Sequence, residues 1–150
     1  MAETVDNETR RFIADAIAGA RKDVALDCNP AFRAMGAVLV EGEPGAVLVS
    51  FEAGEESTQG NGVVSGGTLA AMLDGAMAVA VLSALRPGQT CSTISLSVNM
   101  LRPGMAGRLQ VRAEVEKMGG RVAFARARLL EQGGAVLASA TSSLAVIALS

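Results

Sequence analysis

One carboxylate stands alone in the middle of this chain. Residues 57–85 contain a single ionisable side chain, Asp74, among small, apolar or neutral residues. The stretch begins with a glycine-rich loop and continues with apolar residues at helical spacing on both faces, which predicts a buried helix. A carboxylate about two turns inside such a helix could act as a base or nucleophile. It could equally satisfy buried backbone groups.

The chain contains no histidine. Mechanisms that need a histidine base, such as Ser-His-Asp and Cys-His catalysis, are therefore excluded within this chain, as are histidine-based zinc sites. Cys28 and Cys91 are isolated, so we expect neither a metal site nor a disulfide framework. The chemistry available is that of a carboxylate, backbone amides, hydroxyls, side-chain amides, arginine and lysine.

Composition limits the class of protein. The 150 residues fit a single domain, and half of them are hydrophobic with only 3% aromatic, so the core must be largely aliphatic. A net charge of -2 argues against a nucleic-acid partner. No apolar signal region opens the chain, and no run approaches about 18 uninterrupted apolar residues. We therefore expect a cytoplasmic protein with no membrane partner.

The hydrophobic patterns predict an order of helix, two strands, buried helix and four strands. The predicted ranges are a helix over 3–26, a turn over 32–35, strands over 37–41 and 46–53, a buried helix over 67–85, and strands over 90–101, 108–118, 122–131 and 135–147. Short connections predict antiparallel neighbours. Helices and strands thus occur in separate parts of the chain. This order indicates the α+β class, with a curved antiparallel sheet wrapped around one helix.

Several motifs occur together in a characteristic order. They are Gln59, Gly62, the tripeptide Ser65-Gly66-Gly67, Asp74, a strand over 93–103 ending in Leu-Arg-Pro, Gly119-Gly120-Arg121, and Ala-Ser-Ala-Thr at 138–141. This pattern resembles the hotdog-fold acyl-CoA thioesterases, in their phenylacetate-degradation (PaaI-like) branch. The resemblance covers residues 36–147 as the hotdog core, whereas the N-terminal helix within 1–27 lies outside it.

The resemblance implies a hotdog fold and hydrolysis of an acyl-CoA thioester to a free acid and coenzyme A, with no cofactor. It gives Asp74 the role of base or nucleophile, the Gly66 amide that of oxyanion donor, and Gln59 that of orienting the thioester or a water molecule. Gln59, where many relatives have Asn, resembles the members that act on aromatic acyl-CoAs. The residues expected to bind substrate are Asn61, Gly62, Ser65, Gly67, Ser92 and Thr93.

Helix geometry adds a requirement for two chains. Gly66 and Asp74 are eight residues apart, which corresponds to about 12 Å along a helix axis. They cannot both contact one thioester carbon within a single subunit. If both act, they come from different chains, so we expect a homodimer or a dimer of dimers with sites at the subunit interface.

Other interpretations remain open on the sequence. The family's usual histidine is Ser65 here, which favours a non-catalytic acyl-thioester-binding or regulatory protein as the alternative. Ser65 and Gln59 could also be ordinary N-cap and loop residues. A hotdog dehydratase is disfavoured because those families use a histidine. Four arginines could bind the coenzyme's phosphates or be solvated charges on strands: Arg102, Arg121, Arg126 and Arg128.

Overall fold

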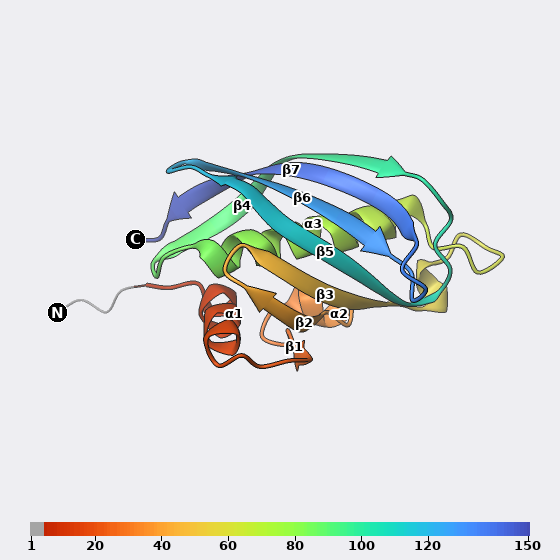
Figure 1. Cartoon of the computed structure of the whole chain (residues 1–150), viewed down its shortest axis with the longest axis horizontal. Coiled ribbons are helices and arrows are strands. Elements are labelled where there is room, and N and C mark those ends of the chain that lie inside the picture. The colour runs from red at the N-terminus through yellow and green to blue at the C-terminus, as the bar shows by residue number, and fades with distance from the viewer. Residues whose placement is uncertain (1–4) are drawn as a thin grey trace.

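The computed structural model describes residues 5–150, which form one antiparallel sheet around a long helix (Figure 1). The helices are α1 (Glu8–Ala18), α2 (Pro30–Ala34), a 3-10 turn η1 (Glu55–Ser57) and α3 (Gly66–Ala84). The strands are β1 (Val24–Ala25), β2 (Val38–Glu43), β3 (Ala46–Ala53), β4 (Gln89–Met100), β5 (Gly107–Met118), β6 (Val122–Leu130) and β7 (Val136–Ala148).

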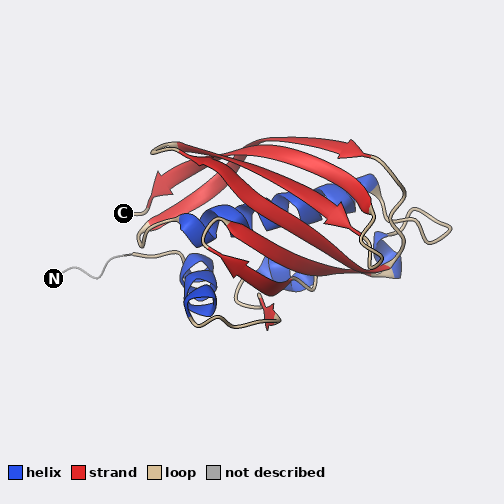
Figure 2. Cartoon of the chain, in the orientation of Figure 1, coloured by secondary structure: helices blue, strands red, loops and turns tan. Residues whose placement is uncertain are grey.

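The sheet has the strand order β1-β2-β3-β5-β6-β7-β4, and every strand pair is antiparallel. Figure 2 shows these strands curving around α3, with α1 beside the sheet near the end of α3. The predicted α+β architecture, an antiparallel sheet wrapped around one helix with an extra N-terminal helix, is therefore confirmed.

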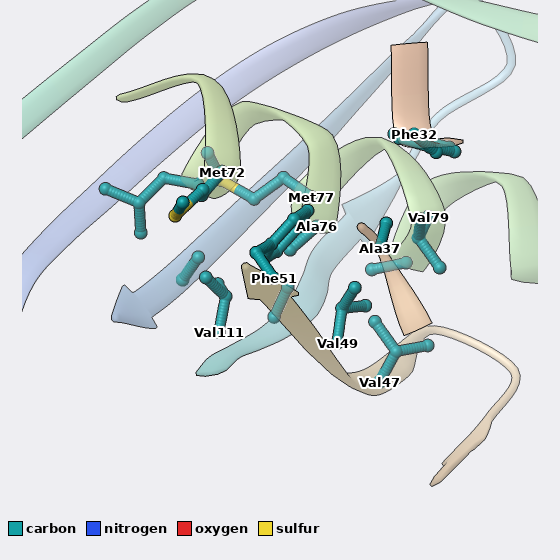
Figure 3. Close-up of a cluster of buried hydrophobic side chains, with 14 of the residues drawn as sticks. Phe32, Ala37, Val47, Val49, Phe51, Met72, Ala76, Met77, Val79 and Val111 are labelled. Atoms are coloured by element: carbon teal, nitrogen blue, oxygen red, sulfur yellow. The ribbon is translucent and has the colours of Figure 1, made fainter. Parts of the chain in front are cut away.

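The core lies between α3 and the inner face of the sheet. Alternate residues of the strands point inward, among them Val49 and Phe51 of β3 and Val111 of β5, and they pack against Met72 and Met77 of α3 (Figure 3). All five of these side chains are buried. Apart from Phe32 and Phe51, the buried core is built from aliphatic residues and methionine, as the composition predicts.

A glycine within α3 lets α2 pack closely against α3. A Cβ placed on Gly75 would lie 3.2 Å from Cε1 of Phe32, a tighter distance than most Cβ contacts. Glycine at this position therefore lets the Phe32 ring of α2 pack directly against the backbone of α3.

The helix α3 is less buried within one chain than its apolar sequence predicts. Eleven of its 19 residues are buried, but Gly66, Gly67 and Ala71 are exposed, and Ala70, Asp74 and Ala78 are only half-buried. By length and composition α3 could cross a membrane, yet 61% of its most apolar window is buried inside the protein. One side of an almost uniformly apolar helix thus remains without cover in the single chain.

The N-terminal region differs from the sequence expectation. The predicted helix over 3–26 begins at Glu8 and ends at Ala18, because Gly19 and Ala20 follow with Ala20 at a φ of 50°. Residues 24–25 form β1 against β2 instead of continuing the helix. Residues 1–4 of that prediction lie outside the described residues.

Two further expectations need correction. The predicted turn at 32–35 is largely the short helix α2, in which Asn29 Oδ1 accepts the Phe32 backbone N–H at 3.1 Å as an N-cap. The short connection from β4 to β5 does not join neighbouring strands, since β4 pairs with β7 and β5 lies between β3 and β6. Connection length predicted the antiparallel sense of the sheet but not its order.

A buried ion pair fastens the N-terminal segment to the end of α3. Asp6 accepts hydrogen bonds from Arg10 Nε at 2.8 Å and from the Gly88 backbone N–H at 3.0 Å, and Arg10 also reaches the Leu85 carbonyl at 3.4 Å. The Arg10 side chain is 7% exposed. Its hydrogen bond to Asp6 holds the pKa of that carboxyl well below its usual range.

We expect Asp6→Asn to lower the free energy of unfolding at pH 7 by about 1.5–3 kcal/mol, because a charge-assisted pair is lost and Arg10 stays buried without a counterion. A carboxyl whose pKa is lowered by folding adds stability above its unfolded pKa of about 4, and that stability is lost progressively as the pH falls. The gap between parent and variant should therefore shrink below about pH 4. Denaturant unfolding at pH 7 and pH 3 measures it.

The matched control for this prediction is Asp27→Asn, since Asp27 is exposed. It should leave the unfolding midpoint nearly unchanged. An Asp6→Asn variant as stable as the control at pH 7 would show that the ion pair contributes nothing to stability.

Candidate active site

The loop before α3 has a left-handed backbone over three successive residues. Gly60, Asn61 and Gly62 have φ angles of 112°, 54° and 74°. Glycine adopts such angles freely, and asparagine is one of the few other residues that visit this region. The sequence Gly-Asn-Gly therefore matches the path that the chain takes here.

This loop is attached to the connection between β4 and β5. The Val64 backbone N–H donates to the Gly104 carbonyl at 2.8 Å, and the Ala106 N–H donates to the Gly62 carbonyl at 3.0 Å. Gln59 lies exposed in the same loop, and its backbone N–H donates to the Val63 carbonyl at 2.9 Å. The loop thus holds Gln59, Asn61 and Gly62 near the start of α3.

Ser65 is the N-cap of α3. Its Oγ accepts the Thr68 backbone N–H at 3.4 Å and lies 2.9 Å from Thr68 Oγ1. This arrangement satisfies one of the N–H groups that have no partner inside a helix. The hydroxyl at the position of the family's histidine is therefore engaged with the helix start.

The Gly66 and Gly67 N–H groups belong to the first turn of α3, where the helix itself provides no acceptor and the helix dipole adds positive potential. Both glycines are exposed. A Cβ on Gly67 would meet no heavy atom within 4 Å, and one on Gly66 would meet Cε of Met100 at 3.6 Å. Packing within the chain requires neither glycine, and the space that a side chain of residue 67 would occupy is open.

The second part of the site joins α3 to β4. Thr93 Oγ1 donates a hydrogen bond to Oδ1 of Asp74 at 2.8 Å, and Asp74 is half-buried. Among residues 5–150, Oδ2 of Asp74 has no hydrogen-bond partner. A β-bulge follows Thr93, where Ile94 is an extra residue between the pairs that Thr93 and Ser95 make with β7. Thr93 thus orients the carboxylate and leaves one oxygen free.

Cys91 lies on the same inward face of β4 as Thr93, since both pair with inward residues of β7. Burial, together with the negative charge of Asp74, raises the pKa of the Cys91 thiol to about 11. The thiol is therefore protonated at neutral pH and is a poor nucleophile. Asp74 is the group at this position that can act as a base or nucleophile.

The expected site residues fall into two groups on one chain. The loop and the helix start hold Gln59, Asn61, Gly62, Ser65, Gly66 and Gly67, and the second group is Asp74 with Thr93. Ser92 pairs with Ala145 on the opposite face of β4 from Thr93, so the chain does not bring it to Asp74. Because Gly66 and Asp74 lie on one regular helix, about 12 Å separates the two groups along its axis.

The free edge of β4 borders both groups. β4 is 12 residues long and pairs only with β7, so its other edge has no strand partner among residues 5–150. Three large apolar side chains on it are exposed, namely Ile94 at 59%, Leu96 at 38% and Met100 at 46%. Met100, next to Gly66, was not expected in the site from the sequence. Its place on the inward face becomes visible only once β4 is paired with β7.

No group of three or more Cys, Asp or Glu side chains within residues 5–150 is arranged to hold a metal ion. The site therefore offers one oriented carboxylate, free helical amides and side-chain hydroxyls and amides. This combination can activate water or form an acyl intermediate, and it can stabilise an oxyanion.

The fold and these features define the class of hotdog thioesterases. A family model described as the thioesterase superfamily matches residues 61–138, more than half of the chain. The chain belongs to this superfamily. The resemblance noted from the sequence is confirmed. No protein with a curated description matches the sequence.

One solved structure at 30% identity supports the same assignment, and two at lower identity share the fold. A candidate thioesterase described as a phenylacetic acid degradation-related protein from Ralstonia eutropha is 30% identical, with a TM-score of 0.77, over 93% of this chain and 99% of that one. The Escherichia coli PaaI protein from the phenylacetic acid degradation operon has a TM-score of 0.77 at 21% identity over 93% and 98% of the chains. A Streptococcus mutans protein bound to acetyl CoA has a TM-score of 0.67 at 23% identity over 74% and 88%.

Proposed function

We propose that this protein is an acyl-CoA thioesterase with active sites composed from two copies of the chain. The observation that carries the proposal is the Asp74 carboxylate, held at 2.8 Å by Thr93 with one oxygen free, on the same helix that begins with the exposed amides of Gly66 and Gly67. A carboxylate and an oxyanion donor are the two parts that thioester hydrolysis requires.

The chemistry assigns each group a task. Asp74 either takes a proton from water as that water attacks the thioester carbon, or attacks the carbon itself to form an anhydride that water then cleaves. The oxygen of the thioester gains negative charge in either route and accepts the Gly66 N–H, strengthened by the helix dipole. The tetrahedral intermediate then expels the coenzyme A thiolate, which is protonated to the thiol. Gln59 orients the thioester or the attacking water.

Three features of the single chain support a dimer. The two reactive groups are about 12 Å apart on one helix, too far to contact one carbon together. One side of α3 is apolar and uncovered. The edge of β4 next to it is unpaired and carries exposed Ile94, Leu96 and Met100. A second copy related by a two-fold axis would cover both and bring Gly66 of one chain to Asp74 of the other.

Coenzyme A and an aromatic acyl group are the proposed substrate components. The Streptococcus mutans relative is bound to acetyl CoA, which supports coenzyme A as the carrier. The name of the Ralstonia eutropha relative refers to phenylacetic acid degradation. A glutamine at the position of Gln59 resembles the family members that act on aromatic acyl groups.

A second candidate is an acyl-thioester-binding protein without turnover. The observation in its favour is Ser65, which stands where the family's histidine is expected and is engaged with Thr68. Such a protein would bind acyl-CoA through the same loop and helix start without hydrolysing it.

Steady-state release of coenzyme A from a panel of acyl-CoAs tests both candidates. We expect turnover, with kcat/KM for phenylacetyl-CoA at least about tenfold above that for acetyl-CoA, because an aromatic ring buries more apolar area than a methyl group. Thiol detection needs an enzyme-only control, since Cys28 and Cys91 are free.

Binding of every acyl-CoA in the panel with no release of coenzyme A would overturn the thioesterase proposal in favour of the binding protein. Equal kcat/KM for aromatic and short aliphatic substrates would overturn only the aromatic part.

A further inference from the structure

The outer face of the sheet, opposite α3, contains a hollow of about 760 Å³. Its floor comes from outward-pointing residues of β3, β5, β6, β7 and β4, and its rim includes Ala20, Arg21 and Lys22 of the segment after α1. The inward neighbours of the floor residues pack against α3, so the sheet separates this hollow from Asp74. It is therefore no part of the candidate active site of the same chain.

Two arginines that line this hollow are neighbours across two strands. Arg112 of β5 and Arg128 of β6 are direct cross-strand partners, and both are exposed. Like charges in this arrangement destabilise a sheet. Among residues 5–150, neither side chain has a carboxylate within 4 Å or a hydrogen-bond partner. The described chain thus gives neither arginine an ion-pair partner, although four glutamates line the same hollow.

Hydrogen-bonding side chains continue from the arginines across the sheet. Arg128 pairs with Ser139 of β7, which pairs with Asn99 of β4. We call Arg112, Arg128, Ser139 and Asn99 the donor row. Neither the Ser139 nor the Asn99 side chain has a partner within the described chain. The row crosses three interstrand spacings of about 4.8 Å, a length of about 14 Å.

Four acidic residues line the hollow, none of them between Arg112 and Asn99, and three are in ion pairs. The fourth, Glu43 of β2, has no ion pair among the described residues and lies in the row of Glu114 and Arg126. Glu114 and Glu116 contact Arg126 in the adjacent row, and Glu41 at the rim lies 3.6 Å from Lys22. Arg126, a candidate from the sequence for binding phosphate, is therefore occupied, whereas Arg128 is free together with Arg112. No carboxylate lies between Arg112 and Asn99 along the row.

We propose that the donor row binds the phosphate of an organic phosphate of nucleotide size. Two guanidinium groups on adjacent strands can both donate to one phosphate, the geometry for which arginine is best suited. Ser139 and Asn99 then meet hydrogen-bonding groups of the remainder of the ligand. The ligand is either a free nucleotide or the nucleotide end of a coenzyme A bound in another copy, and both present a phosphate on a polar body.

Calorimetric titration at constant ionic strength tests the proposal with three probes: inorganic phosphate, AMP and adenosine 3′,5′-bisphosphate. We expect binding to the parent, with Arg112→Gln and Arg128→Gln each weakening the affinity at least about tenfold. Arg11→Gln, at an exposed arginine of α1 outside the hollow, should leave the affinity unchanged. Asp74→Asn should also leave it unchanged, which separates this site from the proposed active site.

The probes distinguish the two sources. Preference for adenosine 3′,5′-bisphosphate, which matches the nucleotide end of coenzyme A, indicates coenzyme A, whereas preference for AMP indicates a free nucleotide. The arginine variants should fold, because each removes a like-charge contact. Equal affinity of parent and both arginine variants, or no binding of any probe, would overturn the proposal. So would dissociation of an oligomer by these variants with no change in phosphate binding, since the row would then be a contact between copies.

Discussion

Asp74→Asn should lower the turnover of acyl-CoA by about a hundredfold or more while leaving the fold intact. Asparagine has nearly the shape of aspartate and can still accept the hydrogen bond that Thr93 Oγ1 donates to Oδ1. It cannot take a proton from water, and it is a poor nucleophile. The measurement is kcat for the best substrate of the acyl-CoA panel, with circular dichroism and size-exclusion chromatography to verify fold and assembly.

Asp74→Glu is the matched comparison, because it keeps the carboxylate on a longer side chain. It should retain part of the activity that Asp74→Asn loses. If Asp74→Asn hydrolyses acyl-CoA at the parent's rate, the carboxylate is structural and the mechanism proposed for it is wrong. Loss of activity in both variants together with loss of the oligomer would indicate a role in assembly instead.

Mixing two inactive variants should restore activity. Asp74→Asn removes the carboxylate, and Gly67→Val places a side chain over the helix start, where a Cβ has no neighbour within 4 Å in its own chain. In a mixed dimer with shared sites, one site combines the intact Asp74 of one chain with the intact Gly67 of the other. With random pairing of equal amounts, about one quarter of the parent's activity should return.

The measurement compares coenzyme A release before and after subunit exchange, which a fluorescent label on one variant verifies. Each variant mixed with itself is the control and should stay inactive. Full exchange without any recovery would contradict sites shared between chains, because a site contained in one chain is never repaired by mixing.

The sequence predicts the sheet strands and the central helix well where hydrophobic periodicity is strong. β3 was predicted at its observed bounds, and α3 within one residue at each end. It fails around residues 19–25, where the apolar pattern of α1 continues past Gly19 although the backbone turns at Ala20. Periodicity reports which residues are buried, but it does not report the left-handed residue that ends a helix.

Part of the candidate functional residues could likewise be predicted from the sequence, and part could not. Asp74 stands out in the sequence because it is the one charge in an apolar stretch, and its partner Thr93 lies in the strand that follows. The pairing of Arg112 with Arg128 was not predictable from either residue alone. It depends on the register between β5 and β6. That register shifts between Val115 and Lys117, and no sequence pattern predicts the shift.

The place of β4 at the sheet edge also shapes how the chain acquires its structure. β4 follows α3 directly, yet it pairs only with β7, the last strand of the fold. During synthesis, α3 and β4 are therefore complete before β5, β6 and β7 exist to receive them. A contact between segments so distant in sequence forms late, since the intervening loop must first be ordered. An apolar helix and an open strand edge are thus exposed together until β7 is made, and such surfaces favour aggregation of the incomplete chain.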